Sequence, residues 1–305
     1  MMSGFSRSYA AGLLAGATLL TTAACGSGSA ETATRGRPEV VAAFYPLQWL
    51  TEQVGGSDAH VTGLTVPGVE PHDLELSIQQ VSELQKAALT VYIKGLQPAV
   101  DDAVEAETSF DAATAVTTLP AGGHEEEGEA DHGHEVSYDP HLWLDPARLA
   151  TVATKLGERL AVADPAHAQA YKDRAAKTAG ALGTLDREFA EGLSTCRTKS
   201  LVTAHEAFGY LADRYKLKQI GITLDPETEP SPARISEVAK LAKAEGVTTI
   251  FTESLVSPKV AEVLANEVGA KTAVLDPLES PPSGDYLSAM RDNLKTLQTA
   301  LGCTA

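Results

Sequence analysis

Short runs of apolar residues alternate with amphipathic segments from residue 39 onwards. Short apolar runs are typical of buried strands, and apolar residues that recur every three or four positions are typical of helices. In the first part of the chain we predict strands at 39–44, 60–66, 89–93 and 113–118, and helices at 46–54, 76–87 and 97–106. This alternation indicates an α/β fold.

A long helical stretch follows from residue 146. Asp164-Pro165 predicts a break in it, because Asp is a common cap and Pro fits the first turn of a helix. The segment 164–195 is then predicted to be one linking helix, which at about 1.5 Å per residue would span about 45 Å. Gly180 and Gly183 weaken its helical propensity, so they allow a kink there.

A second α/β set fills the rest of the chain. We predict strands at 200–203, 217–222, 248–251 and 272–275, and helices that begin near Glu206, Pro232, Pro258 and Asp285. Serine precedes proline at two of these helix starts, which is a good capping signal. The predicted fold class is therefore α/β, with two similar Rossmann-like lobes joined by a long rigid helix. The predicted divisions are an N-terminal lobe at 39–163, the linking helix at 164–195 and a C-terminal lobe at 196–305.

Residues 1–25 have the layout of an export signal. A basic start at Arg7 precedes an apolar run from 9 to 20, which is too short to span a bilayer comfortably. Cys25 directly after two alanines resembles a bacterial lipoprotein cleavage box, although Thr22 stands where that pattern usually has leucine. We expect a signal peptide with a lipobox, lipidation of Cys25, a flexible tether at 26–38 and a place on the outer face of the cell membrane. The alternative is a periplasmic or secreted protein, with Cys25 removed or free.

The charge balance narrows the classes of partner that the protein can bind. A formal net charge of −17 argues against nucleic acid, because such binding relies on Lys and Arg side chains that neutralise phosphates. An acidic surface attracts divalent cations, but it does not choose among them.

Three cysteines occur in the chain. With Cys25 as the lipid anchor, Cys196 and Cys303 remain as a pair in an oxidising compartment, where a disulfide persists. Such a bond would staple the C-terminal tail to its domain. Two unpaired buried thiols are the alternative.

A composition shift at 120–137 interrupts the N-terminal lobe. This stretch is rich in Gly, Glu, Asp and His and is too polar to bury a core, so we expect a loop. Its histidines are His124, His132 and His134. They form either a weak accessory site that gathers metal or incidental parts of a solvated acidic linker.

Three of the eight histidines share a context with one aspartate. His205 and Asp276 come directly after predicted strands, and His72 comes shortly after another. His141 lies where apolar patterning resumes after the acidic loop. Ligands of open α/β sheets bind outside the carboxyl ends of strands, so we expect these four side chains to meet between the lobes. Three imidazole nitrogens and one carboxylate oxygen make a tetrahedral set suited to zinc.

The stretches around these residues resemble one known family. They are Gly-Val-Glu-Pro-His72-Asp-Leu-Glu-Leu, Asp-Pro-His141-Leu-Trp-Leu-Asp-Pro, Ala-His205-Glu-Ala-Phe-Gly-Tyr-Leu and Leu-Asp276-Pro-Leu. Motifs of this kind, in this order, are similar to those of the zinc/manganese solute-binding proteins of ABC transporters (ZnuA-like, cluster A-I metal-binding lipoproteins). The resemblance covers residues 38–303, nearly the whole chain after the signal.

The resemblance implies that His72, His141, His205 and Asp276 are metal ligands in the cleft between the lobes. A histidine at the third position goes with zinc in this family, whereas manganese members typically have glutamate there. Nitrogen ligation also favours zinc physically. Glu253 is expected near the site, because ligating histidines usually donate their other nitrogen to an oxygen. We therefore expect a monomer outside the cytoplasm that binds Zn²⁺ and delivers it to an ABC permease and its ATPase.

Three alternatives stay open. Transport of manganese or iron is the alternative within the same class. A zinc-dependent hydrolase needs an open coordination position and a positioned base, whereas Asp276 would close the site and no His-Glu-x-x-His motif occurs. We therefore expect no enzymatic activity. An adhesin is the third alternative, which no sequence feature requires. His60 and His167 match no ligand motif and are assigned to structure.

Overall fold

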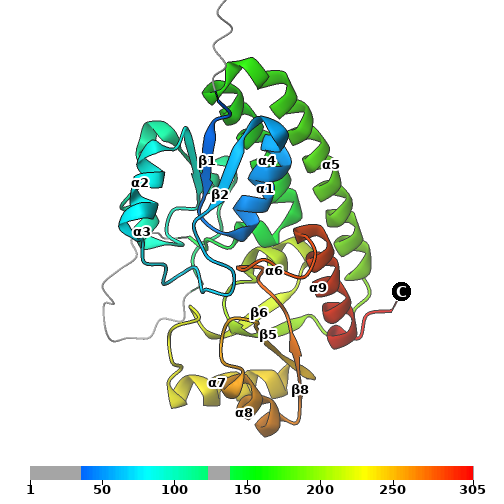
Figure 1. Cartoon of the computed structure of the whole chain (residues 1–305). Coiled ribbons are helices and arrows are strands. Elements are labelled where there is room, and N and C mark those ends of the chain that lie inside the picture. The colour runs from blue at the N-terminus through cyan, green and yellow to red at the C-terminus, as the bar shows by residue number, and fades with distance from the viewer. Residues whose placement is uncertain (1–35, 123–137, 305) are drawn as a thin grey trace, which may run out of the picture. The chain divides into compact units, whose positions relative to one another are not determined.

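Two parallel sheets are the scaffold of residues 36–122 and 138–304, which are the residues that the computed structural model describes (Figure 1). The first sheet has the strand order β2-β1-β3-β4, and the second has the order β6-β5-β7-β8. The strands are β1 (Glu39–Ala42), β2 (His60–Gly63), β3 (Leu89–Tyr92), β4 (Ser109–Asp111), β5 (Ser200–His205), β6 (Lys218–Thr223), β7 (Thr249–Thr252) and β8 (Lys271–Val274). The predicted α/β fold with two lobes is confirmed.

Helices connect the strands and cover the sheets. They are α1 (Tyr45–Gly55), α2 (Ile78–Lys86), α3 (Pro98–Asp101), α4 (Pro146–Ala163), α5 (Ala168–Gly192), α6 (Gly209–Tyr215), α7 (Pro232–Ala244), α8 (Lys259–Val268) and α9 (Tyr286–Leu301). Polar caps begin several of them. The Asp145 carboxylate accepts a hydrogen bond from Ala147 N at the start of α4, and Ser231 Oγ accepts one from Arg234 N in α7. These side chains satisfy backbone N–H groups that have no partner within the helix.

The two sheets share one topology. The first strand of each lobe lies inside its sheet, between the second and the third, so that β1 pairs with β2 and β3 while β5 pairs with β6 and β7. The order of strands therefore changes direction beside β1 and beside β5. In sheets of this kind, ligands bind outside the carboxyl ends of the strands at that point. His205, the last residue of β5, and Glu253, the residue after β7, lie there.

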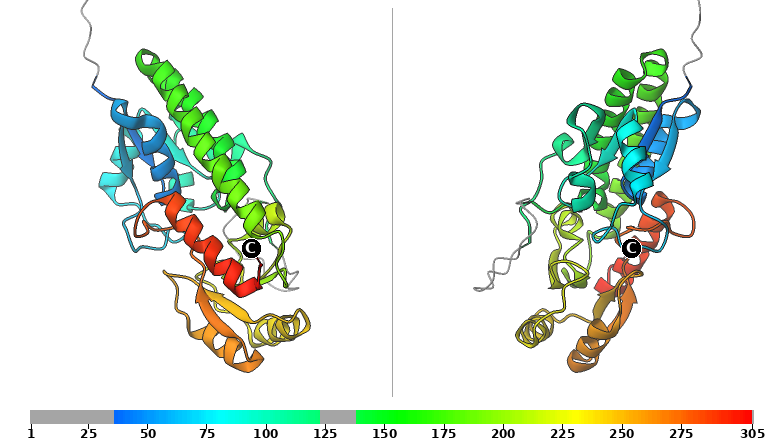
Figure 2. Two further views of the ribbon diagram at one scale, coloured as in Figure 1. Left: turned by 90° about the vertical axis from the view of Figure 1, so that its right-hand side faces the viewer. Right: turned by 60° about the vertical axis from the view of Figure 1, so that its left-hand side comes forward.

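The predicted linking helix forms as α5, which is one continuous helix through Gly180 and Gly183. Figure 2 shows α5 alongside α4, and it also contacts α1 and α9. On the α9 side, Arg291 Nε donates to Glu188 Oε2 at 2.7 Å. The helix is therefore packed against elements of both lobes along its length.

The larger apolar cluster continues from one lobe into the other. It includes Trp143 and Phe44, whose rings meet edge to face with centroids 4.7 Å apart, and Trp49, which stacks on Tyr286 of α9 at 4.8 Å. A smaller cluster fills the space between the second sheet and helices α7 and α8. Burial of this continuous core is the main term that holds the lobes together.

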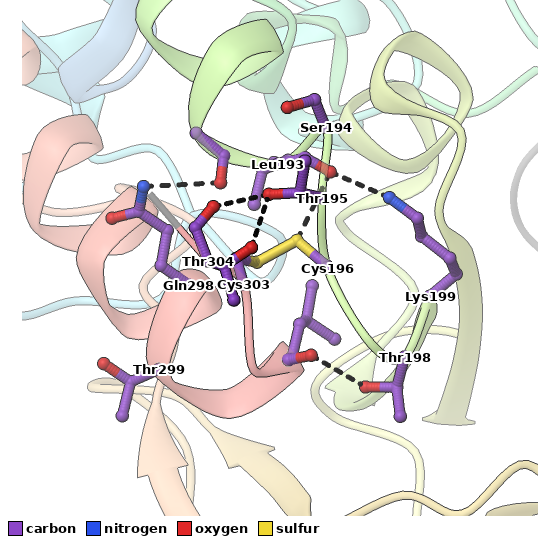
Figure 3. Close-up of a disulfide and its surroundings, with 12 residues drawn as sticks. Leu193, Ser194, Thr195, Cys196, Thr198, Lys199, Gln298, Thr299, Cys303 and Thr304 are labelled. Carbon is purple, nitrogen blue, oxygen red and sulfur yellow. Dashed lines mark hydrogen bonds between the residues drawn. A yellow bond between two sulfur atoms is a disulfide. The ribbon is translucent and has the colours of Figure 1, made fainter.

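A disulfide joins Cys196 to Cys303 across 107 residues (Figure 3). It links the segment after α5 to the end of α9, as the sequence predicted. Hydrogen bonds surround it: Lys199 Nζ donates to Leu193 O at 2.8 Å, and Thr195 Oγ1 donates to Thr304 O. The C-terminal tail is therefore fixed to the start of the second lobe.

Several predicted elements differ from the structure. The strand predicted at 113–118 is wrong, because β4 ends at Asp111 and a 3-10 turn follows at Ala112–Ala115. The Asp111 carboxylate accepts from Ala113 N at 3.0 Å, and this local bond favours the turn over a strand. The helix predicted at 97–106 shortens to α3. Pro258 rather than Ser257 stands at the N-cap of α8, without a side-chain bond.

Two groups of predictions lie outside the described residues. The signal peptide, the lipobox with Cys25 and nearly all of the tether fall in 1–35, and the three loop histidines His124, His132 and His134 fall in 123–137. Within the part of the chain that is described, no helix combines the length and the apolar character needed to cross a bilayer.

Candidate metal centre

Three histidines and one glutamate converge in a buried group. His72, His141, His205 and Glu279 each offer one ligand atom, and these four atoms lie within 4.8 Å of one another. Glu279 Oε1 lies 3.3 Å from His72 Nε2, 3.7 Å from His141 Nε2 and 3.8 Å from His205 Nε2. The three histidines that the sequence singled out are thus brought together from residues that are far apart in the chain.

His205 is fixed by Glu253. Its backbone N donates to Glu253 Oε1 at 3.0 Å, and its ring Nδ1 lies 2.6 Å from Glu253 Oε2. A neutral imidazole that donates Nδ1–H to a carboxylate presents the lone pair of Nε2, which is the atom that faces Glu279. Both side chains are almost fully buried. Glu253 therefore lies beside the site, where the sequence predicted it.

Asp139 holds His141 in the same way. Its Oδ1 atom accepts from His141 N at 2.9 Å and lies 2.7 Å from His141 Nδ1. This role of Asp139 was not predicted from the sequence, although the residue stands in the quoted Asp-Pro-His motif. An aspartate two residues before a candidate histidine, with a proline between them, is the local signal that could have found it.

His72 is held differently. It lies in the loop after β2, and its side chain is 15% exposed, whereas that of His205 is fully buried. Its backbone N donates to Glu70 Oε1 at 3.2 Å, and Glu70 Oε2 is buried without a hydrogen-bond partner. Burial and the nearby charge of Glu279 raise the pKa of Glu70 to about 7. The histidine with the least support is also the one nearest to solvent.

Glu279, and not Asp276, completes the group. The sequence predicted Asp276 because it closely follows the last strand, but the Asp276 carboxylate is engaged elsewhere. Its Oδ1 accepts from Leu278 N at 2.7 Å, and its Oδ2 accepts from Ser254 Oγ at 2.9 Å. Glu279 stands three residues further on, and its side chain is only 1% exposed. The turn between the two residues carries the chain from the strand end into the site.

Burial and mutual charge shift the pKa values of the buried glutamate and of the histidines around it. Burial alone would raise the pKa of Glu279, but the hydrogen bond with His72 and the charges of the three histidines hold it far below its usual range. Burial lowers the pKa of His205, yet Glu253 and Glu279 outweigh that effect and raise it to about 9. His141 is the exception, because burial dominates and lowers its pKa. A proton and a metal ion compete for the same Nε2 lone pair.

The donor set fits a four-coordinate ion. In a tetrahedron with bonds of about 2.0–2.1 Å, donor atoms stand roughly 3.3–3.4 Å apart. His141 Nε2 and His205 Nε2 are 3.4 Å apart, and Glu279 Oε1 lies 3.3, 3.7 and 3.8 Å from the three Nε2 atoms, at or slightly beyond these distances. Three nitrogens and one carboxylate oxygen suit zinc better than ions that prefer all-oxygen shells.

A cavity of about 420 Å³ leads to the group from the surface. His72 and His141 are among the residues that line it. Acidic side chains from both lobes also line it, among them Asp73, Asp225 and Glu227. A cation that approaches the histidines therefore passes a surface of negative potential.

The other described histidines lie elsewhere, as predicted. His60 stands on β2 with its ring 3.9 Å from Glu39 Oε2, and both side chains are largely exposed. His167 Nδ1 lies 2.6 Å from Asp164 Oδ2 at the break between α4 and α5. Asp164 also accepts from Tyr171 OH, so this histidine is part of the helix junction.

Fold and site together form a candidate metal centre that is assembled from two α/β lobes of like topology. Comparison with known proteins agrees. Residues 40–300 match the family described as ZnuA, zinc-uptake complex component A, periplasmic, and the chain belongs to this family.

Individual relatives carry related names. The chain is 37% identical over 278 residues to the zinc-binding lipoprotein AdcA of Streptococcus pneumoniae, and the match covers 86% of this chain and 56% of that protein. This chain therefore spans about half the length of that relative. It is 32% identical over 303 residues to the high-affinity zinc uptake system protein ZnuA of Bacillus subtilis, covering 93% of this chain and 95% of the other.

Solved structures share the fold. The Zn(II)-bound ZnuA-like domain of S. pneumoniae AdcA has a TM-score of 0.72 and 34% identity, covering 87% of this chain and 99% of that one. The laminin-binding protein Lmb of Streptococcus agalactiae, described as a bifunctional protein with adhesin and metal transporting activity, has a TM-score of 0.77 and 33% identity, covering 87% and 100%.

Proposed function

We propose that this protein binds one Zn²⁺ ion outside the cytoplasmic membrane and delivers it to an ABC-type permease with its ATPase. One observation carries the proposal: ligand atoms of His72, His141, His205 and Glu279 converge in a buried group, within 4.8 Å of one another. The names of the relatives, which describe zinc binding and zinc uptake, support the same ion and the same role.

The site suits carriage of an ion better than catalysis. A catalytic zinc keeps one position open for water or substrate, whereas four protein donors fill a tetrahedral shell. Each of two histidines also has a carboxylate on its Nδ1 atom, which favours a fixed geometry. Ligation by nitrogen at His205 favours zinc over manganese, the alternative within this class of transporters.

The location and the accessory features belong to the same proposal. Lipidation of Cys25 would hold the protein at the outer face of the membrane, and the segment 26–38 would act as its tether. The histidines His124, His132 and His134 would gather zinc as an accessory site. The protein would act as a monomer, since one chain supplies all four donors.

The test is a titration of the purified, metal-stripped protein with Zn²⁺ and with Mn²⁺. One tightly bound zinc per chain, with manganese at least about tenfold weaker, is the expected result, because softer nitrogen donors prefer zinc. Equal affinity for the two ions would contradict the proposed preference. Binding of neither ion would overturn the proposal as a whole.

A further inference from the structure

The segment that carries Glu279 has an unusual backbone. We call residues 276–280 the carboxylate arm. Leu278, directly before Glu279, has φ of +63° with its side chain fully buried. A residue with a Cβ seldom adopts this left-handed conformation, and it persists only where the surroundings impose it. The arm therefore needs contacts that hold its shape.

Asn293 of α9 supplies the first of these contacts. Its Oδ1 accepts from Asp276 N at 3.0 Å, and its Nδ2 donates to Asp276 O at 2.6 Å. One buried amide thus satisfies both backbone groups of a single residue. The Asp276 side chain then accepts from Leu278 N, which closes a tight turn at the start of the arm.

Trp143 supplies the second contact, from the other lobe. Its indole Nε1 donates to Pro277 O at 2.7 Å, and its own carbonyl accepts from Tyr286 OH at 2.5 Å. Trp143 is two residues after His141, and the two rings lie with centroids 5.1 Å apart. The segment that carries His141 and the arm that carries Glu279 are therefore joined by one side chain.

The arm also touches the segments that support the other two histidines. Ser254, which donates to Asp276 Oδ2, follows Glu253, the partner of His205. Ser280 Oγ, just beyond Glu279, accepts from Gly68 N at 2.7 Å, in the loop that carries His72. The arm is thus bonded to a segment that carries or supports each of the three histidines.

We propose that Asn293 and Trp143 are positioning residues of the metal centre, which set the Glu279 carboxylate by fixing the backbone of the carboxylate arm. Neither side chain is among the four donors. They act on a backbone whose left-handed turn at Leu278 aims the next side chain at the three histidines. This inference rests on the proposed binding of zinc at the group.

The test compares Asn293→Ala and Trp143→Phe with wild type. Trp143→Phe keeps an aromatic ring in the core but removes the indole N–H together with the five-membered part of the ring, so it tests the same arm if Asn293→Ala does not fold. Zinc affinity is measured by competition with a chelator. Cobalt(II) serves as a second probe, because its visible absorption is strong in a four-coordinate site and weak in a six-coordinate one. Both variants are expected to weaken zinc binding about 10- to 100-fold and to reduce the cobalt absorption at saturation.

Thr51→Val is the matched control. Thr51 is buried in α1, and its hydroxyl bonds to Leu47 O within that helix, so this variant also loses a buried hydrogen bond. It is expected to lose stability while zinc affinity and the cobalt spectrum stay unchanged. If Trp143→Phe and Asn293→Ala keep the zinc affinity and the cobalt absorption of wild type, as Thr51→Val does, the positioning role is overturned and the proposed function stands. If wild type binds no zinc, both are overturned.

Discussion

His141 Nε2 lies 3.4 Å from His205 Nε2, although the two residues are 64 positions apart and belong to different lobes. Each ring is backed by a carboxylate on its Nδ1 atom, Asp139 for one and Glu253 for the other. The same carboxylates also accept from the backbone N–H of their histidine. Two lobes of like topology thus each contribute one histidine that is locked in place and aimed at a shared point.

The carboxylates behind these histidines should matter for affinity. Asp139→Asn and Glu253→Gln keep the size of the side chain but remove the charge that orients the ring and raises its basicity. We expect each to weaken zinc binding about 10- to 100-fold. Competition with a chelator of known affinity measures this. Glu75→Gln, which removes an exposed acid near His72, is the control, and an equal loss there would argue for a general charge effect.

The third histidine should set the choice of metal. His205→Glu replaces a nitrogen donor by an oxygen donor at a buried position that already faces Glu279. We expect zinc affinity to fall relative to manganese affinity by at least about tenfold, because oxygen donors suit manganese. Paired titrations with the two ions measure the ratio. An unchanged ratio would count against His205 as a donor.

The disulfide should stabilise the fold. Cys196 and Cys303 close a loop with a sequence separation of 107, and a loop of that length restricts the unfolded chain strongly. Replacing both cysteines by serine should lower the free energy of unfolding by about 3 to 5 kcal/mol. Urea denaturation of wild type with and without reductant gives the comparison. Each single serine variant should have the same free energy of unfolding as the double variant. A reduced wild type as stable as the oxidised protein would contradict the prediction.

One ion pair gives a pH dependence whose sign is defined. Arg214 donates to both carboxylate oxygens of Asp186, at 2.8 and 2.7 Å, and lowers the pKa of Asp186. The folded pKa lies below the unfolded one, so the stabilisation is present above about pH 4 and is lost as the pH falls through the folded value.

Asp186→Asn therefore tests this dependence. The loss in free energy of unfolding should be on the order of 1 kcal/mol at pH 7, since Arg214 is partly exposed and solvent screens the pair. The difference from wild type should shrink below pH 4. Denaturation series at pH 7 and pH 3 measure it, and a constant difference would show that the charge is not responsible.

The strands and most helices were predictable because their signals are local. Buried parallel strands such as β1 and β5 read as apolar runs, and proline with a polar cap marks the start of α4 and α7. The strand predicted at 113–118 failed where a single side chain, Asp111, closes a turn. Apolar composition alone does not reveal such a bond.

The three histidines of the group were predictable from their place after strands and from their motifs, but its fourth member was not. Counting residues from the end of β8 leads to Asp276. The left-handed turn at Leu278 then redirects the chain and brings in Glu279, and it depends on Asn293 and Trp143 at distant positions. The spacing of residues along the chain does not reveal those contacts.

The most direct test of the account compares the two carboxylates of this segment. Zinc dissociation constants are measured side by side for wild type, Glu279→Gln and Asp276→Asn, of which the last keeps an oxygen that can accept from Leu278 N. We expect Glu279→Gln to weaken zinc binding more than about 100-fold, beyond the range typical of supporting residues, and Asp276→Asn to stay close to wild type. Loss of binding in Asp276→Asn with near-normal binding in Glu279→Gln would contradict it.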